Sequence, residues 1–336
     1  MLREVVILSA ARSAGGKFGG SLSSLNPTEF GGQVIRETIQ RSGIEAEQID
    51  QTIFASAWQA GVGPNPARLA AVGGGVPLDS PAVSVNVRCG SSIQALIFGT
   101  QAIKAGDAQT VLVGGTESTS QVPYILPKAR FGYRMGAGEM VDIMHRDGFL
   151  CPLGGGLMGE MTDDLAREMG ISRDAQDRFA LESHQKAETA FNEGKFEAEV
   201  ATVEVPGRKG QTQPFRDEEI FRAEMNRESL EKLKPVFRKD GTITAGNACA
   251  LCDAASAQLL MDREIARQQE LEPMALIRGY AFVGYEPSRF GLSPVKAIPE
   301  ALQKAGLQLA DIDLIELNEA FAAQYLACEQ KLDLDR

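Results

Sequence analysis

One cysteine of the chain stands where an apolar run gives way to a helical pattern. Cys89 follows the strand pattern Val83-Ser84-Val85 and precedes a glycine and two serines, small residues that suit a tight turn. A side chain at the first turn of a helix faces unpaired backbone N–H groups, and the positive end of the helix dipole attracts an anion such as a thiolate. Because the thiolate is the nucleophilic form of cysteine, we predict that Cys89 is a nucleophile. A buried cysteine that packs as a small hydrophobe is the alternative.

The overall charge limits the partners of such a nucleophile. The 336 residues carry a formal net charge of −11 at pH 7. Nucleic acids and anionic membranes require a basic face, so we expect neither as a partner, whereas an anionic small ligand held by local Arg or Lys stays open. The first residues lead directly into an apolar strand pattern without a signal peptide, and no apolar stretch approaches the about 20 residues of a membrane span. We therefore expect a cytoplasmic protein.

The other cysteines do not indicate a disulfide framework or a metal site. The five cysteines are odd in number and dispersed, and only Cys249 and Cys252 lie close together in the sequence. A zinc site would need two further ligands at comparable spacing, and the two histidines, His145 and His184, lie far from this pair. We predict no disulfides and no metal.

The elements that must position Cys89 alternate between strand and helix. We expect strands at residues 4–10, 53–55, 83–85 and 110–114, and helices at 28–41, 66–72 and 91–104. This alternation predicts an α/β domain with a largely parallel sheet. Residues 120–245 differ, with Gly/Pro-rich stretches and a charged helix at 172–193, and we interpret them as an insertion that covers the first domain. The α/β rhythm resumes with a strand at 274–277, a helix at 294–304 and a strand at 312–317.

The resumed rhythm is also an internal repeat. Residues 35–44 match residues 298–307 register for register, with a shared glycine at 43 and 306 and a shared Ile-Asp pair at 49–50 and 312–313. Such a match predicts that two halves of the protein share one fold. Few residues follow the second Ile-Asp pair, whereas the first copy continues through the strand, turn and helix of Cys89. We therefore expect the chain to stop inside its second domain.

Several segments, in their order along the chain, resemble the thiolase family, the acetyl-CoA acetyltransferases and their 3-ketoacyl-CoA relatives. The resemblance covers essentially the whole chain, and its Asn-Glu-Ala-Phe motif is specific. Residues 123–136 resemble the short-chain, acetoacetyl-CoA-forming branch most closely. The segments that carry the resemblance are 86–92 around Cys89, 113–118 (Val-Gly-Gly-Thr-Glu-Ser), 130–136, 244–247 (Thr-Ala-Gly-Asn) and 318–322 (Asn-Glu-Ala-Phe-Ala).

The resemblance implies a fold and a division into domains. Thiolases have a duplicated five-layer α-β-α-β-α fold, so we expect an α/β protein of this type with an incomplete second domain. The implied parts are an N-terminal domain at 1–119, a covering loop domain that binds CoA at 120–245, a return to the N-terminal domain at 246–272, and a truncated C-terminal domain at 273–336. The family also implies a homodimer or homotetramer.

The resemblance further implies a reaction and its catalytic residues. Two acetyl-CoA molecules condense to acetoacetyl-CoA, or a short 3-ketoacyl-CoA is cleaved, through an acyl group carried on Cys89. Asn318 orders a water that stabilises the enolate oxygen, and Glu319 orients the catalytic groups. Asn318 is also a suitable N-cap for a helix at 319–327.

Coenzyme A thioesters are the implied substrates, and no permanently bound cofactor is implied. Arg222 and Ser229 match the segment that contacts the nucleotide end of CoA, and Ala245 and Gly246 belong to the implied CoA site. Met158 also belongs to the implied CoA site. The family commonly has a histidine before this Met-Gly pair that contacts the pantetheine, and this chain has Leu157 at that position.

The sequence departs from the family in two motifs. It contains neither the Gly-His-Pro segment, whose histidine activates the nucleophile, nor the Cys-x-Gly segment, whose cysteine acts as acid and base. The activity of this chain alone is therefore not implied. One hypothesis is a thiolase whose final segment is absent. The alternative is a catalytically inactive or split thiolase-fold protein that binds CoA or a partner subunit. A ketoacyl synthase relative would share the fold and the cysteine, but its two histidines are also missing.

Overall fold

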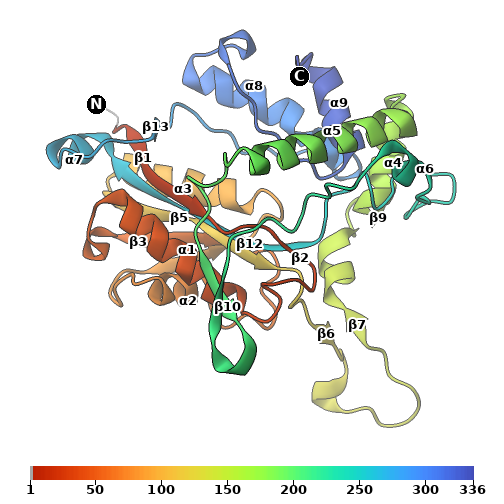
Figure 1. The fold of residues 1–336 in the computed structure, drawn as a ribbon, viewed down its shortest axis with the longest axis horizontal. Helices are drawn as coiled ribbons and strands as arrows, with labels where there is room; N and C mark the ends of the chain where they lie inside the picture. Colours follow the sequence, from red (N-terminus) through yellow and green to blue (C-terminus); the bar gives the residue numbers. More distant parts are fainter. Residues whose placement is uncertain (1–2) are drawn as a thin grey trace. The chain divides into compact units, whose positions relative to one another are not determined.

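The computed structural model describes residues 3–336, which form two compact units. Unit 1 contains the residues up to 144 together with 196–220 and 251–277, and unit 2 contains 145–195, 221–250 and 278–336. Figure 1 follows the chain through both units by colour. These units divide the chain differently from the expected domains, because residues 273–277 belong to unit 1 and part of the expected covering domain does as well.

Unit 1 is built on a mixed sheet with the strand order β13-β1-β12-β5-β3-β4, and β2 also pairs with β12. β3 runs parallel to β4 and β5, whereas β12 is antiparallel to β1, β2 and β5, and β13 is antiparallel to β1. The strands are β1 (Val5–Arg12), β2 (Gly16–Lys17), β3 (Gln51–Ala55), β4 (Ala82–Val85), β5 (Thr110–Ser118), β12 (Cys252–Asp262) and β13 (Ala275–Leu276).

The predicted strands of the first α/β segment are therefore present, but the expectation of a largely parallel sheet is wrong. Helical crossovers join β3 to β4 and β4 to β5, and these strands run parallel, an arrangement that needs such a connection. β12 enters the sheet only after the long excursion through residues 119–251, which imposes no such constraint. The residues at 274–277, expected to begin a second sheet, instead form β13 on the edge of the first sheet.

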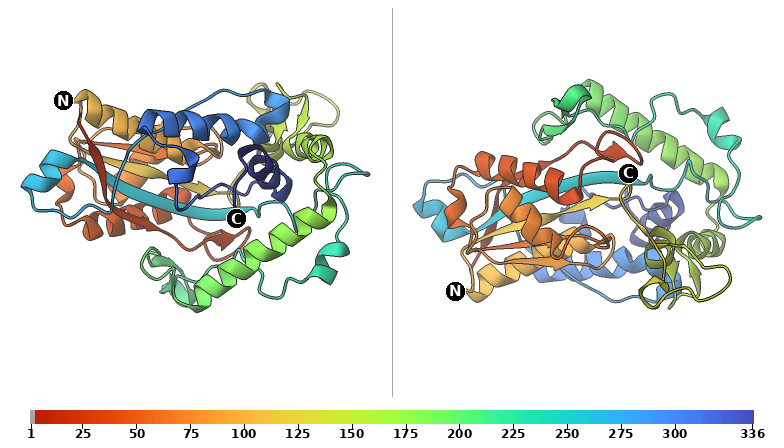
Figure 2. Two further views of the ribbon diagram at one scale, coloured as in Figure 1. Left: turned by 90° about the horizontal axis from the view of Figure 1, so that it is seen from above. Right: turned by 90° about the horizontal axis from the view of Figure 1, so that it is seen from below.

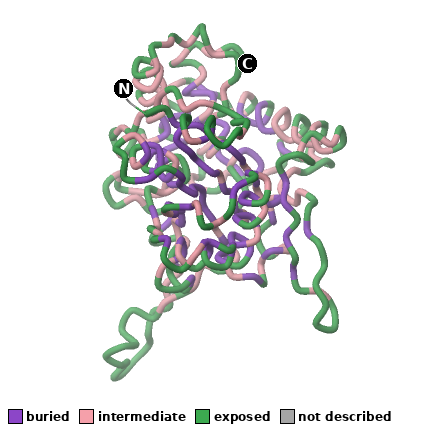
Figure 3. The backbone as a smooth tube through the Cα atoms, turned by 90° about the vertical axis from the view of Figure 1, so that its left-hand side faces the viewer, coloured by how far each residue is buried: buried purple, intermediate pink, exposed green. Residues whose placement is uncertain are grey.

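Three helices cover the two faces of this sheet (Figure 2): α1 (Pro27–Ser42), α2 (Pro66–Gly73) and α3 (Ser91–Ala105). Successive strand residues point to opposite faces. Leu112 packs in one core with Phe30 and Ala70 from α1 and α2, whereas Val111 packs in another with Ile103 from α3. The sheet therefore has a core on each face. Figure 3 colours the buried parts of the chain purple.

Unit 1 also contains smaller elements. One of them begins a hairpin whose intervening residues 126–140 are all exposed. Within residues 3–336, no helix is long and apolar enough to span a membrane, and no group of three His, Cys, Asp or Glu side chains could hold a metal ion. The smaller elements are β6 (Tyr124–Ile125) with β7 (Val141–Asp142), β10 (Val203–Pro206) with β11 (Thr212–Phe215), and α7 (Arg263–Gln268).

Unit 2 is mainly helical. Its core joins apolar side chains of α4, α5 and α9, among them Leu165, Phe179 and Leu326. Helices predicted at 172–193 and 294–304 are confirmed as α5 and α8. The unit contains α4 (Met158–Glu168), α5 (Arg173–Asn192), α6 (Arg227–Glu231), α8 (Ser293–Ala305), α9 (Ala322–Leu332) and the paired strands β8 (Leu150–Cys151) and β9 (Gly156–Leu157).

The strand expected at residues 312–317 is not formed, although the structure describes these residues. A strand requires a neighbour that accepts and donates its backbone hydrogen bonds. The described strands of unit 2 are β8 and β9, which pair with each other. An apolar pattern alone therefore did not produce a strand here.

Candidate active site

The turn that carries Cys89 joins β4 to α3 within unit 1. β4 ends at Val85 and α3 begins at Ser91, as the sequence pattern predicts. Arg88 adopts a left-handed conformation with φ of 57°, which is uncommon for a residue with a Cβ atom. The Ser91 hydroxyl closes the turn, since it accepts a hydrogen bond from Val87 N at 2.8 Å and donates one to Arg88 O at 2.5 Å. Cys89 is exposed, which argues against a buried packing role.

A second segment of unit 1 braces this turn from the end of β3. The guanidinium of Arg88 donates to Ala57 O at 2.9 Å, and Asn86 Nδ2 donates to the same oxygen at 3.2 Å. The guanidinium also lies over the ring of Trp58, 4.9 Å from its centroid. Residues 57 and 58 thus hold both the residue before Cys89 and the start of the turn.

Glu117, on β5, holds residues 57 and 58 in turn. Its carboxylate accepts hydrogen bonds from Ala57 N at 2.6 Å and from Trp58 N at 3.1 Å. Burial raises the pKa of Glu117 above its usual range, although these two N–H groups and the positive charge of Arg88 oppose the shift. A carboxylate that binds two successive N–H groups fixes their orientation.

Cys89 borders a cavity of about 410 Å³ in unit 1. This volume is within the range of small-molecule sites. Small side chains such as Ala55 and Ala255 line part of the wall, and the charged groups at the wall are Arg12, Arg88, Glu117 and Glu218. The exposed thiol therefore faces a space that can admit a small acyl group.

Unit 2 contains the Asn-Glu-Ala-Phe motif, which forms a loop before α9. Backbone bonds attach the loop to the residues after Gly246: Cys249 N donates to Ala320 O at 3.1 Å, and Ala322 N donates to Asn247 O at 2.9 Å. Asn318 is exposed, and Ser183 of α5 donates to the carboxylate of Glu319 at 2.7 Å. The helix begins only at Ala322 with Phe321 as its N-cap, so the expected capping role of Asn318 is wrong. Phe321 forms an antiparallel bridge with Ala248, and the helix begins at the next residue.

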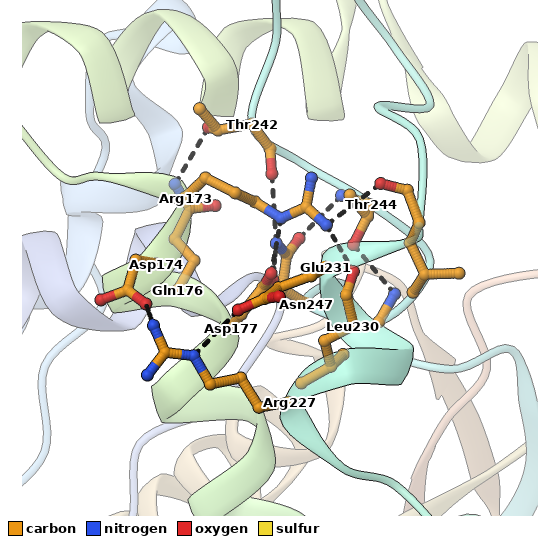
Figure 4. A network of polar contacts seen from close by, with 12 residues as sticks. Arg173, Asp174, Gln176, Asp177, Arg227, Leu230, Glu231, Thr242, Thr244 and Asn247 are labelled. Atoms are coloured by element: carbon orange, nitrogen blue, oxygen red, sulfur yellow. Dashed lines mark hydrogen bonds and ion pairs between the residues drawn. The ribbon is translucent and has the colours of Figure 1, made fainter.

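A buried polar network lies behind this loop (Figure 4). The side chain of Asn247 accepts from Thr244 N at 2.7 Å and donates to Asp177 Oδ1 at 2.8 Å. Asp177 in turn accepts from Arg173 Nε at 2.7 Å, and Arg173 donates to Leu230 O at 2.7 Å. The network therefore ties the turn at 244–247 to α5 and α6.

The similarity of the chain to known proteins is extensive. Residues 5–264 match the thiolase N-terminal domain, and residues 271–336 match the thiolase C-terminal domain. The chain belongs to the thiolase family. This finding confirms the family predicted from the motifs.

Individual thiolases match nearly the whole chain. Acetyl-CoA acetyltransferases of Chromobacterium violaceum and Escherichia coli are each 44% identical, over 98% and 99% of this chain and 84% and 85% of their own lengths. The solved structure of acetyl-CoA acetyltransferase from Syntrophomonas wolfei matches with a TM-score of 0.96 at 34% identity, covering 99% of this chain and 83% of that one. The crystal structure of the Bacillus anthracis acetyl-CoA acetyltransferase matches with a TM-score of 0.96 at 38% identity, covering 100% of this chain and 84% of that one. The thiolase-type α/β fold is thereby confirmed.

The structure distributes the predicted site residues of this thiolase over both units. Cys89 lies in unit 1, whereas Asn318, Glu319 and the predicted CoA-contact residues lie in unit 2. Gly246 is buried beside α6, where a Cβ atom would stand 2.4 Å from Leu230 Cδ2, and Ala245 next to it is exposed.

The remaining predicted CoA-contact residues have local roles as well. The Ser229 hydroxyl donates to Asn226 O at 2.7 Å and accepts from Asn226 N at 3.1 Å at the start of α6. Arg222 is exposed, and its backbone N donates to His184 Nδ1 at 3.2 Å. Met158 begins α4 and packs, half-buried, against the core of unit 2.

Sequence reasoning assigned no role to Glu117. The residue lies within the segment 113–118 that carries the family resemblance, but its partners, Ala57 and Trp58, are distant in the sequence and bind it through backbone N–H groups. A backbone partner leaves no pattern of side chains to detect. Only the presence of a carboxylate at the end of a buried strand could have drawn attention to it.

Proposed function

We propose that this thiolase transfers acyl groups between thioesters of coenzyme A, with Cys89 as the acyl acceptor. Its relatives named acetyl-CoA acetyltransferase indicate acetyl-CoA as the substrate, condensed to acetoacetyl-CoA, and short 3-ketoacyl-CoA as the substrate of the reverse cleavage. The observation that carries the proposal is the exposed thiol of Cys89 at the start of α3, beside a cavity of about 410 Å³.

The acylation step needs only the thiol and the thioester. Cys89 Sγ attacks the carbonyl carbon, the bond from that carbon to the sulfur of CoA breaks, and the proton of Cys89 leaves with the CoA thiol. The positive end of α3 favours negative charge on the attacking sulfur. The later deprotonation of a second acetyl-CoA needs a base, and we assign that step to none of the 336 residues, which contain neither a Gly-His-Pro nor a Cys-x-Gly segment.

The family resemblance assigns further residues to the reaction and to binding of the thioester. Asn318 orders a water for the enolate oxygen, and Glu319, held by Ser183, orients groups of the site. The predicted contacts with CoA are made by Arg222, Ser229, Met158, Ala245 and Gly246.

The proposal also includes the setting of the enzyme. CoA thioesters are substrates rather than permanently bound cofactors. A cytoplasmic location agrees with the strongly acidic composition, which offers no basic face to a membrane or a nucleic acid. A homodimer or homotetramer is proposed from the family.

Mass spectrometry of the intact protein tests the acyl acceptor. After incubation with acetyl-CoA, we expect one acetyl group per chain, located at Cys89 by peptide mapping. The Cys89→Ala variant should acquire none, whereas Cys249→Ala, which removes another exposed cysteine, should react like the wild type. Absence of the acetyl group from the wild type would overturn the proposal. Retained binding of CoA in that case would favour a binding protein without acyl transfer.

A further inference from the structure

The carboxylate of Glu117 occupies a central place in unit 1 that the acylation chemistry does not explain. It binds Ala57 N and Trp58 N, and neither of these groups belongs to the Cys89 turn. The opposite side of the same peptide segment, Ala57 O, accepts from both Arg88 and Asn86. A continuous chain of contacts therefore leads from β5 through residues 57–58 to the residues that precede Cys89.

The turn needs such support because Arg88 is left-handed. Its φ of 57° places a side chain with a Cβ atom in a region that favours glycine. A strained residue of this kind persists only where the surrounding contacts determine its conformation. Its backbone is bound within the turn, by Asn86 and Ser91, and its side chain is bound outside the turn, by a hydrogen bond to Ala57 O and by its position over the Trp58 ring. The two partners of the side chain are the residues whose backbone Glu117 holds.

We propose that Glu117 is a positioning residue that keeps the Cys89 turn in its reactive conformation by orienting residues 57 and 58. The inference rests on the proposed role of Cys89 as acyl acceptor and adds a residue that acts on it without contacting the substrate. When the two N–H groups lose their acceptor, Ala57 O and the Trp58 ring shift and Arg88 relaxes. Cys89 then leaves its place at the start of α3.

Glu117→Gln is the decisive variant. A glutamine has one acceptor oxygen, and its NH₂ group would face a second N–H donor. We expect the maximal rate of Cys89 acetylation to fall about 10- to 100-fold, as displacements of reacting groups by about 1 Å do. The concentration of acetyl-CoA that gives half of this rate should stay within about twofold, because Glu117 acts on the turn and not on binding.

Glu219→Gln is the matched control. Glu219 also lies in unit 1 and also accepts from two backbone N–H groups, Lys17 N at 3.0 Å and Ser21 N at 3.2 Å. It does not belong to the described residues that line the cavity beside Cys89. We expect this variant to acetylate Cys89 within about twofold of the wild-type rate.

Trp58 provides a direct spectroscopic readout, since it is the single tryptophan of the chain. Its emission should change in Glu117→Gln and stay as in the wild type in Glu219→Gln. Arg88→Gly adds a test of the strain, because glycine adopts a positive φ freely. The loss caused by Glu117→Gln should therefore be smaller in the Arg88→Gly background.

The outcomes separate this inference from the proposed function. If the wild type is not acetylated at Cys89, the proposed function fails, and the Trp58 emission still tests the contact with Glu117. If the wild type is acetylated and Glu117→Gln reacts equally fast, or if Glu219→Gln is slowed as much, the positioning role is overturned. Circular dichroism verifies folding. Should Glu117→Gln not fold, Glu117→Asp retains the charge with a shorter reach and should show a smaller loss in the same direction.

Discussion

The Cys89 turn and the Asn318 loop both place a predicted reactive residue ahead of a helix, but they are held in different ways. At Cys89 the helix begins two residues later, and side chains hold the turn. Ser91 accepts a hydrogen bond within the turn, and Arg88 donates to Ala57, whose backbone N–H is bound by Glu117. At Asn318 the chain is attached by backbone hydrogen bonds to residues 247–249 before α9 begins.

This difference indicates how each region tolerates change. A turn held by a few side chains and a strained backbone should lose its shape, and thus its reactivity, while the rest of unit 1 stays folded. A loop held by backbone bonds to a buried polar network should instead fail together with the network, and the loss should appear as a loss of stability. Each prediction below tests one side of this contrast.

The largest expected effect is on the network side, with Asn247→Ala. The substitution leaves Thr244 N and one oxygen of Asp177 without partners in a buried place. Each such group costs about 1–3 kcal/mol, so we expect the free energy of unfolding to fall by about 3 kcal/mol. Urea unfolding measures this loss, and amide exchange at Cys249 and Ala322 should accelerate with it.

Asn226→Ala is the matched control, because Asn226 also binds backbone groups in unit 2 but is exposed at the start of α6. Loss of such a helix cap costs about 1 kcal/mol. A loss for Asn247→Ala no greater than that of the control would contradict the contrast between the two regions.

A smaller effect on stability is expected for Ser91→Ala in the Cys89 turn. The hydroxyl connects Val87 N to Arg88 O, and its loss should lower the free energy of unfolding by about 1 kcal/mol. Acetylation of Cys89 should slow severalfold, because the turn loosens locally. The matched control is Ser42→Ala, whose buried hydroxyl also donates to a carbonyl, Ile39 O, and accepts from an N–H group, Ile44 N. Equal acetylation rates in the two variants would show that Ser91 does not shape the site.

The same contrast explains which parts were predictable from the sequence. The strand and the helix on either side of Cys89 follow local sequence patterns, so both were predicted at the right residues. The loop at Asn318 depends on pairing with residues distant in the sequence, and the expected helix start and the strand at 312–317 were therefore wrong. The places of β12 and β13 in the sheet of unit 1 also depend on pairing with strands distant in the sequence, and they were not predicted. Glu117 acts through backbone N–H groups, which no motif records.

The smallest expected effect concerns Arg222, a predicted CoA contact whose segment is held by a side chain, as the Cys89 turn is. His184 Nδ1 accepts from Arg222 N, which requires an imidazole without a proton on that nitrogen. Burial, and then the charge of Arg222, lower the pKa of His184 below its usual range. The unfolded chain thus binds a proton more readily, so the free energy of unfolding should rise with pH from the lowered pKa to the ordinary one.

Because His184 is partly exposed, solvent screening should keep this rise below about 1 kcal/mol. NMR titration resolves the effect, since the chain has only two histidines. The imidazole signal lost in His184→Asn should titrate below the ordinary range of histidine, and the amide signal of Arg222 should shift with it. An Arg222 amide that does not respond over that pH range would show that the bond to His184 does not hold this segment.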